Sequence, residues 1–455
     1  MSVNLTAEID NYALYLPALS KDLGEYVVRD ESGRDIDLKA TPLDLNFLNG
    51  DSKLWTYKWC LASAGYFAGS KRSNAVTQRD PAHSWVLGDS GGYQIGTGAL
   101  RKAKAWGTFA RNPDRIGRLW RESGVRGEFV RWLDANCDYA MTVDMPLWAR
   151  NAKYSSSPFH HCSVDLLTEL TVENLHFIDQ HRGIVGNCKF LNVLQGETAD
   201  EEDFWYSRIR DFDFEGWAYG STVKTKDGAI RLLRRMLLLR DDGMLGNSKQ
   251  WFHILGLSQL IWSVILTAIQ RGVQKSTNSP FTISFDSCTP FFWAGKTQKY
   301  AKPPTLTTDI KSWAISQAPF PVGHTAATYH AAKAFPAGSP ISSRLNIGNM
   351  NPRKSPYDHQ TFDRFSRNTL GNHNAYVWLR AIIDANHVAF RGGPIPQVIA
   401  DVIGLVGNLF AAEHWATLLD QNADLLKRAL GRSASNDNRN TKPKKILGVL
   451  DRDAA

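Results

Sequence analysis

Residues 84–89 read Ser-Trp-Val-Leu-Gly-Asp, a short apolar run that ends on a carboxylate. Near-continuous apolar runs of this length are typical of parallel strands that are covered on both faces. Further runs of this kind, separated by stretches with helical spacing, are Tyr139–Asp144, Lys189–Gln195, Gly216–Gly220, Trp251–Gly256 and Thr282–Asp286, with Leu54–Ala62 as an additional candidate. Six or more strand–helix units within about 250 residues predict an α/β fold with a (β/α)8 TIM barrel rather than an open doubly wound sheet.

Composition divides the chain into five parts. Residues 1–50 are interpreted as an N-terminal extension, and residues 51–300 as the barrel core. Residues 301–370 open with a stretch rich in Pro, Ser, Thr, Gly and Asn, which predicts a loop-rich insertion. Helical patterns return in residues 371–430, where we expect C-terminal helices packed on the barrel. Residues 431–455 are predicted to form a flexible basic tail.

The overall composition is that of a globular protein with a modest excess of positive charge. The 455 residues include 53 basic and 45 acidic side chains, and 43% are hydrophobic, which excludes a disordered or collagen-like chain. The net charge of +8 fits a polyanionic partner, and it equally fits a soluble protein without one. Five scattered cysteines, the absence of a secretory signal and the absence of an apolar run long enough to span a bilayer predict a cytoplasmic protein without membrane association.

Polar residues stand at the ends of four predicted strands. Three are the aspartates Asp89, Asp144 and Asp286, and the fourth is Gln195. In a (β/α)8 barrel the carboxyl ends of the strands meet at one rim, where active sites are built. A single carboxylate in this position usually caps the following helix, but three with an amide are less easily explained in that way. Paired carboxylates beside an amide and glycines suit chemistry on a glycosidic bond next to a flat heterocycle.

The stretch Asp89-Ser90-Gly91-Gly92-Tyr93-Gln94 resembles the DSGG(F/Y)Q signature of the tRNA-guanine transglycosylases. Weaker matches follow in the order that this family shows. They are Val143-Asp144, Val193-Leu194-Gln195-Gly196, Gly216-Trp217-Ala218-Tyr219-Gly220, Ile254-Leu255-Gly256 and Phe285-Asp286. The resemblance covers roughly residues 50–300, with a faint extension at His373-Asn374. It implies a barrel fold and an enzyme that exchanges guanine in a nucleic acid for another base.

The resemblance also implies a role for each matching residue. Asp286 would be the nucleophile that attacks C1′ of the target nucleoside, and Asp89 would be the general acid and base that handles the proton on the exchanging bases. Tyr93 would stack on one face of the base and Leu255 would lie on the other. Asp144 would bind the N–H edge of a guanine-type base. The remaining base-binding positions are Gln195, which would bind the carbonyl edge, and the backbone at Gly196 and Gly220.

For three of these residues the sequence leaves structural alternatives open. Tyr93 is otherwise a core residue, Gln195 a cap at the end of a strand, and Asp144 a partner in an ion pair. Ser221 stands where the family has a second glycine, which puts a backbone contact at that position in doubt.

Two departures from the family pattern bear on the nucleic acid that is recognised. The tRNA enzymes hold zinc through three cysteines and a histidine, and His373 resembles that histidine. The cysteine positions are occupied by Ser342, Arg344 and Ile347, so that a closed zinc site is not expected there. We therefore predict no metal and no cofactor, with His160-His161-Cys162 interpreted as a polar loop. The second departure is Phe292, which stands where the tRNA enzymes tend to have an arginine.

Two basic segments lie after predicted strands. Arg101–Arg131 contains nine basic and three acidic residues, a local charge of +6, with interleaved aromatic residues, and Lys224–Arg240 has a local charge of +5. Such segments suit the phosphate backbone of a nucleic acid, although a solvated helix face has the same composition. The residues predicted to bind nucleic acid are Arg101, Lys102, Lys104, Arg111, Lys224 and Lys226.

These observations favour a DNA-guanine transglycosylase, which resembles the branch of the superfamily that inserts 7-deazaguanine bases of the preQ0 type into DNA. DNA is the preferred partner over tRNA because the zinc region and the segment after Asp286 are rebuilt. A helper protein that opens the duplex is a further possible partner. The alternatives are a tRNA-guanine transglycosylase and a non-catalytic nucleic-acid-binding subunit. An unrelated barrel glycosidase is disfavoured because it would have no reason to carry DSGGYQ.

Overall fold

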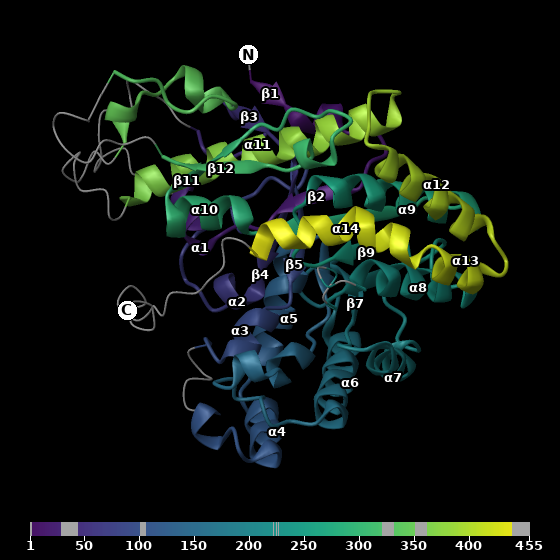
Figure 1. The fold of residues 1–455 in the computed structure, drawn as a ribbon. Coiled ribbons are helices and arrows are strands. Elements are labelled where there is room, and N and C mark those ends of the chain that lie inside the picture. The colour runs from purple at the N-terminus through teal and green to yellow at the C-terminus, as the bar shows by residue number, and fades with distance from the viewer. Residues whose placement is uncertain are drawn as a thin grey trace.

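A parallel eight-stranded barrel surrounded by helices forms the centre of the molecule (Figure 1). The computed structural model describes residues 2–28, 44–100, 106–221, 223, 225, 227–320, 332–350 and 362–438. The barrel strands are β2 (Leu14–Pro17), β4 (Trp59–Ser63), β5 (Trp85–Asp89), β6 (Tyr139–Met141), β7 (Lys189–Leu194), β8 (Gly216–Tyr219), β9 (Trp251–Ile254) and β10 (Thr282–Ser287). All six principal strand predictions are confirmed, as is the (β/α)8 fold class.

The barrel closes through a strand that the sequence analysis assigned to the N-terminal extension. Strand β2 pairs with β10 along its length, and Ala18 forms a parallel bridge with Leu61 of β4. The Leu19 N–H donates to the Leu61 carbonyl at 2.9 Å. The barrel therefore begins at Leu14, and the predicted boundary at residue 51 is wrong. The additional candidate strand Leu54–Ala62 corresponds to two strands, the short β3 (Trp55–Thr56) and most of β4. Strand β3 pairs with β1 (Val3–Asn4).

Alternate residues of each strand point into the barrel and form its inner core. This core contains aliphatic side chains from six strands: Leu14, Leu16, Leu61, Leu87, Met141, Leu191, Val193 and Ala218. At the amino-terminal end of the strands Trp85 and Trp251 stack with ring centroids 4.4 Å apart, and Tyr139 packs against both. Because side chains alternate along a strand, the inward positions that follow these residues lie at the opposite, carboxyl-terminal mouth. That mouth is where the polar residues of the sequence analysis fall.

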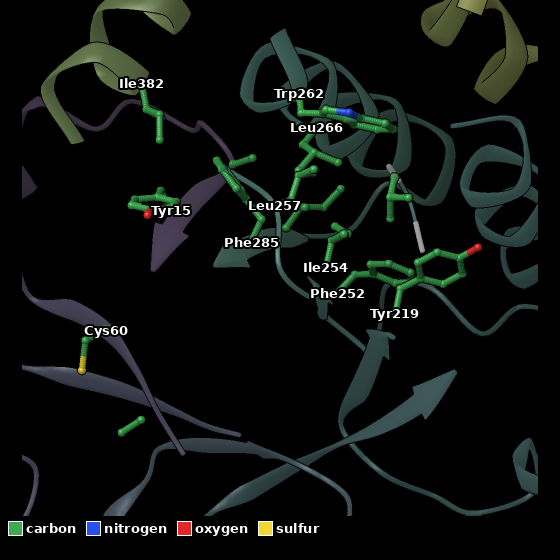
Figure 2. Packing of buried hydrophobic residues seen from close by; sticks show 14 of the residues in the cluster. Tyr15, Cys60, Tyr219, Phe252, Ile254, Leu257, Trp262, Leu266, Phe285 and Ile382 are labelled. Carbon is green, nitrogen blue, oxygen red and sulfur yellow. The ribbon is translucent and has the colours of Figure 1, made fainter. Parts of the chain in front are cut away.

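Helices connect the barrel strands and surround the sheet (Figure 1). These are α1 (Lys21–Tyr26), α2 (Ala64–Phe67), α3 (Gly92–Thr97), α4 (Pro113–Glu122), α5 (Val125–Asn136), α6 (Val164–His181), α7 (Ala199–Ile209), α8 (Gly228–Asp241), α9 (Leu260–Thr277) and α10 (Thr289–Thr297). Figure 2 shows Ile254 and Phe285, from the outer faces of β9 and β10, beside Leu266 of α9 in this outer core. Both sides of the sheet are thus buried, as the apolar strands require.

The C-terminal third packs on this barrel. Strands β11 (Lys299–Lys302) and β12 (Ser316–Pro319) form an antiparallel pair, followed by short 3-10 turns. The helices are α11 (Arg364–Phe390), α12 (Gln397–Ala411), α13 (Trp415–Gln421) and α14 (Ala423–Asn438). Helix α11 packs on α9 and α10, and α12 on α9. Helix α11 begins before the predicted boundary at residue 371, and α14 continues past residue 430, so the predicted tail does not begin at residue 431. Among the described helices none is long and apolar enough to cross a membrane.

Candidate active site

The barrel fold brings the four strand-end residues of the sequence analysis to one mouth. Asp89 is the last residue of β5, Asp286 lies near the end of β10, and Gln195 follows β7 directly. Asp144 lies in the loop after β6 and is hydrogen-bonded to Gln195. Asp89 and Asp286 each lie two residues beyond an inward-facing position, so both carboxylates point to the inside of the mouth. The two carboxylates are close enough for their charges to interact.

Asp89 sits in a buried position that favours its protonated form. Burial raises the pKa of this carboxyl above its usual range, and the charge of Asp286 raises it further. Hydrogen bonds from the Ser63 side chain and the Gly91 backbone act in the opposite direction. Ser63 is the register partner of Asp89 on the neighbouring strand β4. A carboxyl group with this environment holds a proton more readily than an exposed aspartate does, which suits a general acid.

Asp286 is held by two donors on its Oδ1 atom. The Gly256 N–H donates to it at 2.8 Å, and His253 Nε2 lies 3.3 Å away. Gly256 has a φ of +71°, a left-handed conformation that glycine adopts without strain, in the turn after β9. The side chain of Asp286 remains 13% exposed. Its position is therefore fixed while the carboxylate stays accessible from the mouth.

His253 is a site residue that the sequence analysis missed. Its ring is fully buried, and Nδ1 lies 2.8 Å from Ser284 Oγ. The Trp251 indole N–H also donates to that hydroxyl at 2.8 Å. Since a serine hydroxyl has one hydrogen, we infer that Ser284 donates to Nδ1 and that the Nε2 hydrogen faces Asp286. The available signal was the strand alternation, which turns residues 251, 253 and 255 to the same inner face.

Asp144 is a second carboxyl group in this mouth with a strongly perturbed acidity. It is 7% exposed, and it accepts hydrogen bonds from Ser90 Oγ at 2.9 Å and from Gln195 Nε2. Burial raises its pKa to about 7, and the nearby charge of Asp89 contributes to the rise. The two hydrogen bonds lower the pKa but do not offset burial. Each carboxylate oxygen keeps acceptor capacity for an incoming N–H group.

Gln195 clamps the loop that carries Asp144. Its Oε1 accepts the Leu147 N–H at 2.9 Å, and Nε2 donates both to Asp144 and to the Met145 carbonyl at 3.1 Å. Both amide hydrogens are thus already in use. Gln195 thus holds the loop after the neighbouring strand β6, and its contact with a base stays a prediction. Contact with a base carbonyl requires that one of these two donated bonds be exchanged.

The structure requires glycine at position 196, whereas position 220 has room for a Cβ atom. Gly196 has a φ of +154°, and a Cβ atom there would lie 2.5 Å from the Glu202 backbone nitrogen at the start of α7. The Gly220 N–H donates to the Leu194 carbonyl at 2.8 Å. A Cβ atom on Gly220 would lie 3.4 Å from Gln195 Cγ. Ser221, which replaces a family glycine, is buried beside them.

An exposed aromatic ring borders the mouth. Tyr93 on α3 is 61% exposed, so the alternative that it is a core residue is wrong. Its ring stacks on Trp148 with centroids 6.0 Å apart and an interplanar angle of 26°. Leu255 is half-buried against the inner core of the barrel. Tyr93 therefore offers an open aromatic face, and Leu255 a small apolar surface, beside the carboxylates.

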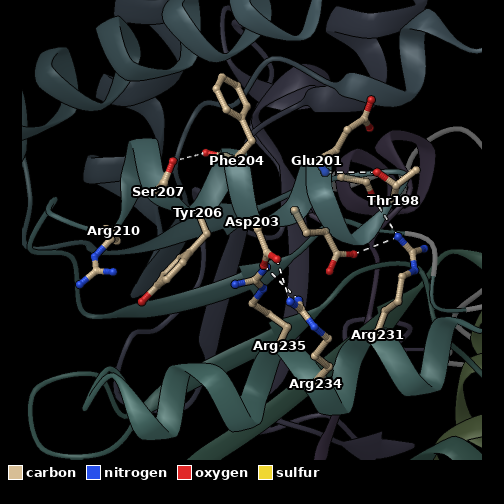
Figure 3. A network of polar contacts seen from close by, with 12 residues as sticks. Thr198, Glu201, Asp203, Phe204, Tyr206, Ser207, Arg210, Arg231, Arg234 and Arg235 are labelled. Atoms are coloured by element: carbon tan, nitrogen blue, oxygen red, sulfur yellow. Dashed lines mark hydrogen bonds and ion pairs between the residues drawn. The ribbon is translucent and has the colours of Figure 1, made fainter. Parts of the chain in front are cut away.

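The predicted phosphate-binding residues fall into two groups. Arg101, Lys102, Lys104, Lys224 and Lys226 lie outside the described residues, and Arg111 is exposed just before α4. Three of the four arginines of α8, in contrast, pair with acidic residues of α7 (Figure 3), and the fourth, Arg240, pairs with Asp241. Arg231 binds Glu202 at 3.0 Å, and Arg234 and Arg235 both bind Asp203. The interpretation of α8 as part of a basic rim is corrected accordingly, because its charges are neutralised within the fold.

The residues around His373 do not fit a zinc site. Its ring is buried, with Nδ1 2.8 Å from Ser339 Oγ and with Phe335 packed edge-on. Burial lowers the pKa of His373 to about 4. Of the positions that match the family's cysteines, Ser342 binds the Pro336 carbonyl and Ile347 is buried. Within the described residues no three His, Cys, Asp or Glu side chains gather as they would around a metal.

Comparison of the chain with protein-family models and with curated proteins gives no match. The chemistry of this mouth is therefore inferred from its geometry and from the motif resemblance.

Proposed function

We propose that this protein is a guanine transglycosylase that acts on DNA and exchanges guanine for a 7-deazaguanine base. The observation that carries the proposal is the pairing of Asp89 and Asp286 at one barrel mouth with different surroundings. Asp286 is fixed by donors and remains accessible, whereas burial favours the protonated form of Asp89. Two carboxyl groups with separate environments are what a double-displacement glycosyl transfer needs.

In the first half of the reaction, Asp286 attacks C1′ of the target nucleoside and the C1′–N9 bond to guanine breaks. Asp89 gives its proton to the departing base, so that neutral guanine leaves and an ester joins Asp286 to C1′. In the second half, Asp89 takes the N9 proton of the incoming base, whose N9 then attacks C1′ and releases Asp286. Two inversions retain the configuration of the sugar, and both carboxyl groups return to their starting states.

The base would lie between the Tyr93 ring and the Leu255 side chain. Asp144 supplies acceptor oxygens for the N–H edge of the base, and its pKa of about 7 lets it take either protonation state near neutral pH. Because Gln195 already uses both amide hydrogens, base binding would exchange its bond to Asp144 or to Met145 for one to the base carbonyl.

Two observations support DNA over tRNA. The donor set around His373 does not fit the zinc site of the tRNA enzymes. Phe292, which replaces their arginine after the nucleophile, is 53% exposed on α10. An exposed aromatic ring at this position suits a base, whereas the arginine of the tRNA enzymes suits a phosphate group.

A two-substrate labelling assay tests the proposal. The purified chain is incubated with radiolabelled guanine or preQ0 and with single-stranded DNA, duplex DNA or unmodified tRNA. We expect incorporation into DNA, and single-stranded activity without duplex activity would indicate that a helper opens the duplex. Incorporation into tRNA alone would overturn the choice of DNA. Binding without incorporation on any substrate would favour a non-catalytic subunit.

The nucleophile is tested separately by covalent trapping. Wild-type protein should form a denaturation-resistant adduct with the substrate strand, and Asp286→Asn should lose the adduct and at least about 10³-fold in exchange rate. Asp89→Asn, in contrast, should slow formation of the adduct without removing the nucleophile. Exchange by Asp286→Asn at the wild-type rate would refute the assignment.

A further inference from the structure

Exposed aromatic side chains gather near the candidate active site. Among the described residues, the most exposed aromatic side chains of large hydrophobic residues are Tyr93 at 61%, Phe292 at 53% and Tyr66 at 42%. Tyr93 is already assigned to the target base. Tyr66 and Phe292 have no role in the chemistry described so far, yet they lie on the two helices that follow β4 and β10. Figure 1 shows α2, α3 and α10 on the same side of the strands.

Tyr66 stands on α2, immediately after the strand that supplies Ser63. Its hydroxyl is hydrogen-bonded to the Gln94 side chain, which anchors the ring beside the DSGGYQ segment. The same hydroxyl lies within electrostatic range of Asp89, Tyr93 and Cys288. Tyr66 therefore lies near both the general acid and the start of α10.

Phe292 continues this surface on the other side of Cys288. The Phe292 N–H donates to the Cys288 carbonyl at 2.9 Å, so the two residues lie one helical turn apart on the same face of α10. Cys288 itself is exposed and follows the nucleophile Asp286 by two residues. Tyr66, Cys288 and Phe292 thus lie at one edge of the mouth, and we name this group the Tyr66–Phe292 lip.

We propose that the Tyr66–Phe292 lip is a stacking subsite for the nucleobase that neighbours the target guanine in the bound strand. The inference rests on the proposed function and adds to it a site for a second nucleotide. An enzyme that acts on C1′ must draw its target out of the stack, which leaves the neighbouring base with one uncovered face. An aromatic ring at the edge of the pocket covers that face and holds the strand open.

The charges of the mouth favour a base over a phosphate group at this lip. Asp286 lies close by, and its carboxylate would repel a phosphate group placed beside it. A nucleobase is neutral and has an apolar face, so it gains from Tyr66 and Phe292 without that penalty. The ring at position 292 thereby accounts for the absence of an arginine there. Stacking tolerates any base, so the lip would bind the neighbour without selecting its identity.

Fluorescence of a base analogue tests the subsite without requiring catalysis. A single-stranded DNA oligonucleotide carries 2-aminopurine next to the target guanine, and its emission is quenched when the base stacks on an aromatic ring. We expect quenching by the wild-type chain and by Asp286→Asn. Phe292→Ala and Tyr66→Ala should each reduce quenching and weaken binding about 5- to 100-fold. Phe204→Ala is the matched control, since Phe204 on α7 is 38% exposed and lies outside the mouth.

Unchanged quenching in Phe292→Ala and Tyr66→Ala, or an equal loss in Phe204→Ala, would overturn the subsite. The labelling assay reports separately on base exchange. A chain that quenches but does not exchange base would therefore refute the proposed chemistry and leave the subsite supported. A chain that exchanges base with unaltered quenching in both variants would refute the subsite alone.

Cys288 provides a second, covalent test with its own internal control. The other four cysteines, Cys60, Cys137, Cys162 and Cys188, are buried, whereas Cys288 is exposed. An oligonucleotide with a disulfide-tethered thiol on the neighbouring base should undergo exchange, in which the Cys288 thiolate displaces the small leaving thiol and forms a protein–DNA disulfide. We expect crosslinking at least tenfold faster with the tether on the neighbouring base than with the tether five nucleotides away. Equal rates for both positions, or crosslinking retained in Cys288→Ser, would overturn the placement.

Discussion

His253 Nε2 lies 3.3 Å from Oδ1 of Asp286, and the imidazole is fully buried beneath that carboxylate. The hydroxyl of Ser284 holds the other ring nitrogen and in turn accepts the indole N–H of Trp251. A chain of hydrogen bonds thus runs from the aromatic stack at the bottom of the barrel to the proposed nucleophile. This chain orients the carboxylate from inside the barrel and leaves it accessible to a substrate that enters through the mouth.

Replacement of His253 by phenylalanine should slow base exchange. The variant keeps the ring volume but removes the donor to Asp286, and we expect kcat to fall about 10- to 100-fold with little change in KM for the base. Adduct formation in single-turnover experiments is the measurement. His253→Gln, which can still donate, should recover part of the rate, and His176→Phe on the surface of α6 serves as the control. Full activity in His253→Phe would show that the Gly256 N–H alone positions Asp286.

The acidity of Asp144 predicts a specific pH dependence of stability. Its pKa rises from an unfolded value near 4 to about 7 in the folded chain, so the native state binds more protons between these limits. The free energy of unfolding should therefore fall as the pH rises from about 4 to about 7, by on the order of 4 kcal/mol from this group. In Asp144→Asn the side chain does not titrate, and this part of the slope should be lost.

Denaturant unfolding of wild type and Asp144→Asn at several pH values checks the Asp144 prediction. The comparison uses the slopes with pH, because the new amide faces the Gln195 amide and changes the absolute stability at every pH. Burial raises the pKa of Asp89 as well, so a residual slope of the same sign remains in the variant. Parallel curves for the two proteins would contradict the shift of Asp144.

A substitution at Gly196 distinguishes a structural role of this residue from a role in binding the base. An added Cβ would meet the Glu202 backbone, which cannot move without displacing α7, and the φ of +154° is unfavourable for alanine. We expect Gly196→Ala to lower the free energy of unfolding by about 2–4 kcal/mol. Gly404→Ala is the control, since that position on α12 has open space, and should be neutral or stabilising by up to about 1 kcal/mol. A Gly196→Ala chain with unchanged stability and a raised KM for the base would favour direct contact instead.

The sequence predicted the barrel well because each strand is an apolar run that ends on a polar residue. It missed β2, whose four residues end on Pro17 and lack a polar terminus. Only the ladder with β10 and the bridge to β4 identify Leu14–Pro17 as a barrel strand. The positions of Asp89 and Asp286 at one mouth followed from the fold class. The hydrogen bonds of Gln195 did not, because they depend on the course of the loop after β6.

The error over α8 has a similar cause. A count of charges along Lys224–Arg240 cannot include the acidic residues opposite them, because Glu202 and Asp203 belong to α7. Packing of the two helices converts an apparent basic face into a set of internal ion pairs. His253 was missed for the same reason, because its partner is distant in the sequence. One histidine in an apolar strand is usually part of the core. Its partner Ser284 lies on the next strand of the barrel.

The segment around α4 is therefore the better candidate for phosphate contacts. Arg111 and Arg118 are both exposed, and neither forms an ion pair with any residue in the described part of the chain. Each phosphate contact in single-stranded DNA contributes about 0.7 to the slope of log affinity against log salt concentration. We expect the double variant Arg111→Gln/Arg118→Gln to reduce that slope by about 1.4, with a proportional loss of affinity at low salt.

Two matched variants distinguish this surface from charge in general. Arg208→Gln, at an exposed position on α7, makes the same change per residue and should leave the slope unaltered. Arg234→Gln removes a bidentate contact to Asp203, with distances of 3.0 and 2.7 Å, and should lower the free energy of unfolding by about 1 kcal/mol without changing the slope. Binding titrations at four salt concentrations give the slopes and affinities, and denaturant unfolding gives the change in stability of Arg234→Gln. A reduced slope in Arg234→Gln, with the wild-type slope in the double variant, would place the phosphate contacts on α8 instead. Arg234 would then have to release Asp203 when it binds DNA.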